Sequence, residues 1–163
     1  MLLLFAGSLI LGFFINGLQK SPLPLVYSSP KARLSSTIKY MIANAVTSGQ
    51  TLDPDVKLDE MRAISSATSG IIVDARPEVF YKIGHIPSAL SLPRDDFEDH
   101  YLDLEFKLSS LKEKMIVVYC SGSDCQDSQL VADSLLALGY KHVRVFRGGW
   151  EEWESAHYPA EKE

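Results

Sequence analysis

Residues 115–128 read MIVVYCSGSDCQDS, and this stretch decides the fold. Its first five residues, Met115–Tyr119, are apolar and rich in β-branched side chains, which is typical of a strand buried on both faces of a parallel sheet. The next residues, Ser121–Asp124, are small and turn-forming, and Gln126–Leu138 then has the character of a helix. The sequence therefore predicts a strand, a tight loop and a helix, with Cys120 where the strand ends.

Further strand and helix signals alternate along the chain on both sides of this stretch. The other expected strands are Ile71–Ala75, Ala89–Leu92 and His142–Phe146, with Asp55–Lys57 as a candidate edge strand. The other expected helices are Leu58–Ser66, Pro77–Ile83, Asp95–Leu111 and Trp150–Ala156. Alternation of this kind predicts an α/β fold: a doubly wound parallel sheet of four to five strands with helices on both faces.

The N-terminal segment has a different composition. Residues 1–18 hold no ionisable side chain, and as a helix they would be about 27 Å long, close to the thickness of bilayer hydrocarbon. We expect a transmembrane anchor helix here, with a cleaved signal peptide or a buried core helix as alternatives. Residues 19–54 contain four prolines and have the character of a juxtamembrane linker. Within this linker, helical spacing predicts a short amphipathic helix formed around Leu34, Ile38, Met41, Ile42 and Ala45. We expect it to pack on the folded domain, with the membrane surface as the alternative.

Charge and composition exclude several classes of protein for the domain over residues 55–160. The chain has 163 residues and a net charge of −5, and all 21 acidic residues lie after position 50. A nucleic-acid-binding surface on this domain is therefore not expected. The two cysteines are too few for a disulfide-rich scaffold or a four-cysteine zinc site, and we expect neither a metal nor an organic cofactor.

The loop that follows the central strand is the candidate site. Ligands of open α/β sheets bind outside the carboxyl ends of the strands. A tight loop leading into a helix presents backbone N–H groups and partial positive charge, which stabilise a thiolate or a bound anion. We therefore expect Cys120 to be the more nucleophilic thiol, whereas an inert buried cysteine is the alternative that position alone leaves open. The loop residues that would surround it are Ser121, Gly122, Ser123, Asp124, Cys125 and Gln126.

Three motifs resemble the single-domain rhodaneses, a family of sulfurtransferases. They are DARPEVFYKIGHIPSALSLP at residues 74–93, VVYCSGSDCQDS at 117–128 and ALGYKHVRVFRGGWEEWESAHYP at 137–159. The resemblance implies a small doubly wound α/β domain in which Cys120 takes up sulfane sulfur as a persulfide and passes it to a thiol or cyanide. It also implies supporting structural roles for Asp74 and Arg76. We expect His85 to bond backbone rather than to act as a general base.

Some residues depart from the family's pattern. Many relatives that use thiosulfate carry Arg or Lys in the active loop, whereas this loop carries Asp124 and Asp127, so a persulfide or polysulfide is the expected donor. A related phosphatase branch has Arg at the position of Gln126, and phosphatase chemistry is therefore not expected. Cys125 has two interpretations: a resolving thiol that attacks a Cys120 persulfide, or a residue that only fills space.

Three functions remain open at this point. A sulfurtransferase is the first, and its partners would be a small sulfur donor, a thiol acceptor and a membrane. The second is a non-catalytic module that docks a protein at the membrane through its acidic helix, and the third is a Cys120/Cys125 dithiol redox switch. The side of the membrane is also open. Resemblance to anchored relatives with a Leu-Pro-Leu linker favours the periplasm, but the basic residues after the apolar segment favour the cytoplasm.

Overall fold

The computed structural model describes residues 28–45 and 52–163, together with Ile15 and Leu18. The anchor expected over residues 1–18 thus lies outside the described residues, apart from these two positions. Within the described part of the chain, no helix is both long enough and apolar enough to cross a membrane.

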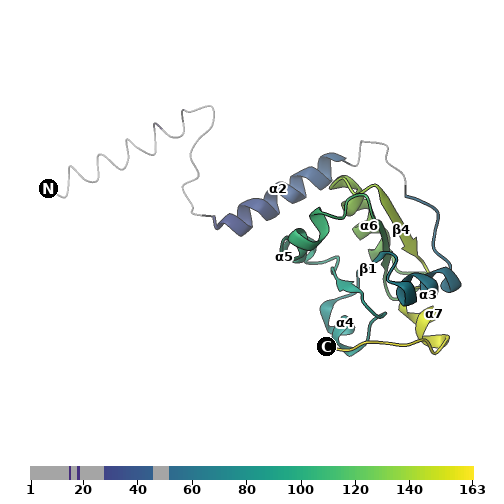
Figure 1. The fold of residues 1–163 in the computed structure, drawn as a ribbon. Helices are drawn as coiled ribbons and strands as arrows, with labels where there is room; N and C mark the ends of the chain where they lie inside the picture. Colours follow the sequence, from purple (N-terminus) through teal and green to yellow (C-terminus); the bar gives the residue numbers. More distant parts are fainter. Residues whose placement is uncertain (1–14, 16–17, 19–27, 46–51) are drawn as a thin grey trace. The chain divides into compact units, whose positions relative to one another are not determined.

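A four-stranded parallel sheet lies at the centre of the domain (Figure 1). Its strands are β1 (Ile71–Asp74), β2 (Leu90–Ser91), β3 (Met115–Tyr119) and β4 (His142–Phe146), in the order β2-β1-β3-β4. The predicted α/β fold with a parallel sheet is therefore confirmed, and β3 and β4 have the predicted bounds. β2 is shorter than expected because Ala89 N–H bonds back to Ile86 O in a turn and Pro93 has no N–H to extend the ladder.

The candidate edge strand at residues 55–57 is not a regular strand. Two backbone hydrogen bonds still tether this segment to β4, from Asp53 N to Val143 O (3.1 Å) and from Val56 N to Val145 O (2.9 Å). Pro54 lies between them without an N–H, which interrupts a regular ladder. The Arg144 side chain donates to Pro54 O at 2.7 Å and pairs with Glu60, so that β4 holds the segment by side chain as well.

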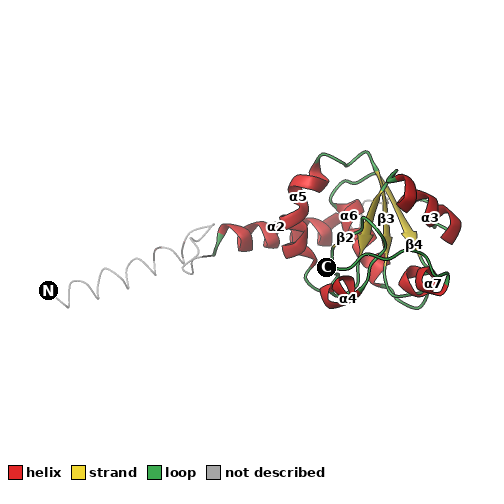
Figure 2. Cartoon of the chain, turned by 60° about the horizontal axis from the view of Figure 1, so that its bottom comes forward, coloured by secondary structure: helices red, strands yellow, loops and turns green. Residues whose placement is uncertain are grey.

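Helices cover both faces of the sheet, and Figure 2 shows the strands in yellow among them. One face packs against α5 (Phe97–Ser109) and α6 (Asp127–Ala137), with Val73, Val118 and Val145 from the sheet in that core. The other face packs against α3 (Leu58–Ala67), α4 (Glu78–Ile83) and α7 (Gly149–Ser155), with Ile72, Val117 and Phe146 from the sheet. Because alternate residues of one strand point to opposite faces, the unbroken apolar run of β3 supplies both cores.

The helix expected in the linker is α2 (Pro30–Ala45), which is longer than its apolar spacing indicated. Pro30 stands at its first position, where a missing N–H costs nothing. Ile38 is buried in the core beside α5 and α6, and Ile42 is partly buried there. Lys31 Nζ also reaches Asp103 Oδ1 on α5 at 3.2 Å. The side chains of α2 therefore pack on the domain, whereas Leu34 and Met41 remain exposed.

Candidate functional site

The turn after β4 fixes the start of the loop that follows β3. Trp150 N–H donates to Cys120 O and Glu151 N–H donates to Ser121 O, both at 2.8 Å. Gly149 has φ +61°, and a Cβ at this position would lie 2.5 Å from Cys120 O. Only glycine combines this left-handed backbone with so close an approach. The Gly148–Gly149 pair therefore sets the position of Cys120 at the carboxyl edge of the sheet.

The two cysteines form a disulfide, with their Cα atoms 6.3 Å apart. Cys120 is only 1% exposed, whereas Cys125 is partly exposed. Sequence spacing could not show whether the two sulfurs meet, because the span of the four residues between them depends on how the loop curls. The structure thus brings the sulfur of the expected nucleophile, Cys120, to that of Cys125, the possible resolving thiol.

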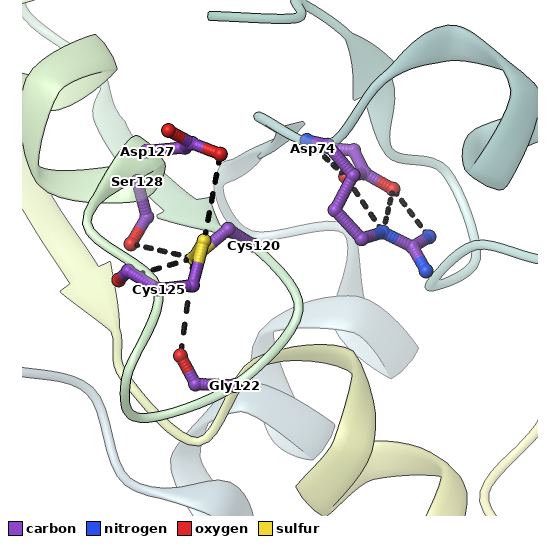
Figure 3. Close-up of a disulfide and its surroundings, with 7 residues drawn as sticks. Asp74, Cys120, Gly122, Cys125, Asp127 and Ser128 are labelled. Atoms are coloured by element: carbon purple, nitrogen blue, oxygen red, sulfur yellow. Dashed lines mark hydrogen bonds and ion pairs between the residues drawn. A yellow bond between two sulfur atoms is a disulfide. The ribbon is translucent and has the colours of Figure 1, made fainter.

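The two sulfurs have different polar neighbours, which Figure 3 shows as dashed contacts. The Ser128 hydroxyl oxygen lies 3.3 Å from Cys120 Sγ, and the carbonyl oxygens of Cys125 and Gly122 lie 3.4 and 3.9 Å from it. Asp127 Oδ2 lies 3.6 Å from Cys125 Sγ. In this disulfide-bonded form Cys120 thus faces a hydroxyl and carbonyl groups. The cradle of backbone N–H groups stays a prediction for the reduced loop.

Asp74 and Arg76 form a buried ion pair at the end of β1, apart from the sulfurs (Figure 3 labels Asp74). Arg76 Nη2 lies 2.6 Å from Asp74 Oδ2 and donates to Gly84 O at 2.7 Å. Tyr119 O–H donates to the same carboxylate at 2.6 Å. Burial opposes the charge on Arg76, but the Asp74 carboxylate outweighs it and the guanidinium pKa is raised. Burial, followed by the Asp74 charge, raises the pKa of Tyr119. This cluster ties the ends of β1 and β3 to the loop before β2.

His85 is also built into the framework. Its Nδ1 lies 2.8 Å from Tyr81 O, and its ring stacks on Tyr81 with 3.8 Å between centroids. Its Nε2 lies 3.7 Å from Glu161 Oε2. None of these contacts involves the sulfur pair. Within residues 28–45 and 52–163, no group of three or more histidine, cysteine or carboxylate residues is placed to hold a metal ion.

Two cavities flank the loop. One, of about 390 Å³, is bordered by Ser121 with Trp150 and Phe80. The other, of about 490 Å³, is bordered by Asp124, Cys125, Gln126, Gln129, Leu130 and Arg147. Arg147 was missed from the sequence, since it follows β4 and reaches the loop only when β3 and β4 lie side by side. Its position at the carboxyl end of a strand was the signal that could have found it.

The described geometry can be compared with known proteins. A tRNA uridine(34) hydroxylase from Pectobacterium atrosepticum is 30% identical over 99 residues, which cover 60% of this chain and 27% of that protein. An adenylyltransferase and sulfurtransferase UBA4 from Candida albicans is 34% identical over 89 residues, which cover 51% of this chain and 19% of that protein. The matched part is therefore about a quarter or less of the length of these relatives.

Solved structures and a family model agree with this likeness. The crystal structure of the BH2092 protein from Bacillus halodurans has a TM-score of 0.58 and 25% identity, covering 78% of this chain and 84% of that chain. The solution structure of the rhodanese-like domain of the Alr3790 protein from Anabaena sp. has a TM-score of 0.52 and 27% identity, covering 69% and 81%. The model of the rhodanese-like domain matches residues 57–156, more than half of the sequence. The chain therefore belongs to the rhodanese-like domain family.

Proposed function

We propose that this protein is a sulfurtransferase that carries sulfane sulfur as a persulfide on Cys120. The observation that carries the proposal is the sulfur pair in the loop after β3, where Cys120 Sγ is held beside Ser128 Oγ and joined to Cys125. Two relatives bear names that include sulfurtransferase or the rhodanese-like domain. A buried sulfur with a hydroxyl neighbour suits an intermediate that must be kept from water.

The proposed loading step begins with the reduced protein. The Cys120 thiolate attacks the outer sulfur of a persulfide or polysulfide, forms a new S–S bond and expels the remainder of the donor as a thiolate. An acceptor thiolate, or cyanide, then attacks the outer sulfur of the Cys120 persulfide. This attack returns Cys120 to a thiolate and leaves the sulfur on the acceptor.

Cys125 provides a second route for release. Its thiolate attacks Cys120 Sγ of the persulfide, a bond forms between the two cysteines, and the outer sulfur leaves as hydrosulfide. This route would form the same Cys120–Cys125 disulfide that the structure contains. No outside oxidant is needed, because the persulfide itself is reduced as the cysteine pair is oxidised.

Mass spectrometry of the reduced protein after treatment with polysulfide tests the proposal. We expect a gain of one sulfur on Cys120 in the Cys125→Ser variant, which cannot form the disulfide. The wild type should release hydrosulfide and lose two hydrogens. If neither protein gains sulfur at any time point, the proposal is wrong.

A dithiol redox switch is the second candidate, because the observed disulfide is also what such a switch would form. It differs from the first in needing no sulfane sulfur. Under this function the wild type loses two hydrogens and releases no hydrosulfide when the oxidant is hydrogen peroxide, which carries no sulfur. The Cys125→Ser variant acquires no sulfur from polysulfide.

We further propose that residues 1–18 anchor the protein in a membrane, as single-pass proteins do. The support is the absence of ionisable side chains over 18 residues. The domain would then meet its donor and acceptor beside the membrane, on the periplasmic side that the resemblance to anchored relatives implies.

A further inference from the structure

The two sulfurs of the disulfide differ in access. Cys125 borders the cavity of about 490 Å³, whereas Cys120 does not border it and is 1% exposed. A dissolved thiol that enters this cavity therefore meets Cys125 Sγ first. Attack at one sulfur of a disulfide releases the other as a thiolate, so attack here would release Cys120.

The polar neighbours of the two sulfurs favour Cys120 over Cys125 as the sulfur that leaves as a thiolate. Asp127 Oδ2 lies 3.6 Å from Cys125 Sγ, and a carboxylate at this distance opposes negative charge on that sulfur. Ser128 Oγ lies 3.3 Å from Cys120 Sγ, and its hydroxyl can donate to a thiolate. Cys120 is thus the better leaving group of the two.

The cavity beside Cys125 presents both signs of charge. Arg147 borders it with its side chain about half exposed, held by Asp55 at Nε (2.6 Å) and by Gln129 at Nη2 (3.1 Å). Neither contact uses Nη1. Asp124 borders the same cavity and is exposed. A simple anion would meet the Asp124 carboxylate and a simple cation would meet Arg147, so a ligand with both charges fits best.

We propose that this cavity binds a small thiol with both an ammonium and a carboxylate group, cysteine being the simplest, and that this thiol opens the disulfide at Cys125. The incoming thiolate forms a mixed disulfide with Cys125 as the bond to Cys120 breaks and Cys120 leaves as a thiolate. The thiolate of a second thiol molecule then attacks the sulfur of the first thiol in the mixed disulfide. The bond to Cys125 breaks, the two small molecules leave as a disulfide, and Cys125 is left as a thiolate. The inference rests on the proposed function in one respect: the released thiolate is the one that would carry sulfur.

Four thiols of similar size test the inference on the oxidised full-length chain at low ionic strength. They are cysteine, mercaptopropionate, cysteamine and mercaptoethanol, which differ in charge. The rate of disulfide opening is measured at equal thiolate concentration, with Cys120 trapped by alkylation. Ratios of variant to wild-type rates cancel the intrinsic reactivity of each thiol.

We expect Arg147→Gln to slow disulfide opening by cysteine and by mercaptopropionate about threefold to fivefold, as for partly exposed charge pairs. Asp124→Asn should slow disulfide opening by cysteine and by cysteamine by a similar factor. Each ratio is divided by that for mercaptoethanol, whose only charge is the thiolate itself, so that the effect of the second charged group is isolated. Arg144→Gln is the matched control: Arg144 holds the same edge segment through Pro54 but does not border the cavity, so it should leave every ratio unchanged. The trapped mixed disulfide should be on Cys125.

The inference is overturned if the mixed disulfide forms on Cys120, or if Arg147→Gln and Asp124→Asn slow all four thiols alike. Sulfur loading of the reduced protein is measured separately. Loading without charge selectivity in the opening step would overturn this inference alone. Charge-selective opening at Cys125 without loading would support it and overturn the proposed function.

Discussion

At the scale of single residues, two cysteines that are five positions apart differ in burial and in their polar neighbours. Cys120 is enclosed beside Ser128, whereas Cys125 borders a cavity and lies beside Asp127. The sequence predicted Cys120 as the nucleophile from its position after a strand. It could not distinguish the surroundings of Cys125, because these depend on the path of the loop and on Arg147, which arrives from the end of β4.

Replacement of Cys120 by serine should abolish sulfur transfer from polysulfide to cyanide or dithiothreitol, because oxygen cannot replace sulfur as the carrier. Circular dichroism and thermal unfolding should show an intact fold. Cys125→Ser is the matched control and should retain transfer to cyanide. Turnover near the wild-type level in Cys120→Ser would remove Cys120 from its proposed role.

The burial of Tyr81 predicts how the free energy of unfolding changes with pH in alkaline solution. Burial, with smaller effects of nearby carboxylates, raises the pKa of Tyr81 to about 12. The stabilisation is complete below the unfolded pKa of about 10 and is lost as pH rises toward 12, because the unfolded chain releases this proton first. The difference in unfolding free energy between wild type and Tyr81→Phe should therefore shrink by about 1.4 kcal/mol between pH 9 and pH 11. A difference that stays constant across this range would contradict the assignment.

At the scale of elements, short-range pattern predicted the bounds of β3 and β4 but gave too long a strand at β2 and a strand at residues 55–57 that is not regular. β3 lies between two neighbouring strands and is an unbroken apolar run, as expected of a strand buried on both faces. β4 lies at the edge of the sheet, and its Val143, Val145 and Phe146 are buried. The segment around Val56 also looked like a strand, but Pro54 and the Arg144 side chain give it an irregular path. The contact between the β4–α7 turn and the loop after β3 is tertiary, so its consequence for Cys120 could not be predicted from either motif alone.

Replacement of Gly149 by alanine should destabilise the domain by about 2 to 3 kcal/mol, since the residue has φ +61° and its Cβ would lie 2.5 Å from Cys120 O. Gly139→Ala is the matched control: φ is +90°, but the nearest atom is Lys112 Nζ at 3.7 Å. Its loss should be about 1 to 2 kcal/mol, from backbone strain alone. Urea unfolding measures both. If the two variants lose equal unfolding free energy, the close contact between Gly149 and the Cys120 loop does not contribute to stability.

At the scale of the whole molecule, the domain is a layered α/β fold, and the loop after β3 places both cysteines at the carboxyl edge of the sheet. Both faces are covered by helices, and α2 extends the core beside α5 and α6. This arrangement predicts that the domain folds without the apolar N-terminal segment.

A chain that lacks residues 1–20 should be soluble and folded, because every buried core residue of the described domain is retained. Membrane flotation of the full-length and shortened proteins in the same cells is the measurement, with the full-length chain expected in the membrane fraction. If the shortened protein also floats with membranes, residues 1–18 are not what holds it there.

The central claim is that Cys120 carries sulfur, and a single-turnover transfer tests it most directly. Reduced Cys125→Ser protein is loaded with isotopically labelled polysulfide, freed of donor, and divided. One half is fragmented to locate the label, and the other half is mixed with cyanide. The account predicts one labelled sulfur on Cys120 and an equal amount of labelled thiocyanate after mixing. Label that is absent from Cys120, or that stays on the protein after cyanide is added, would contradict the account.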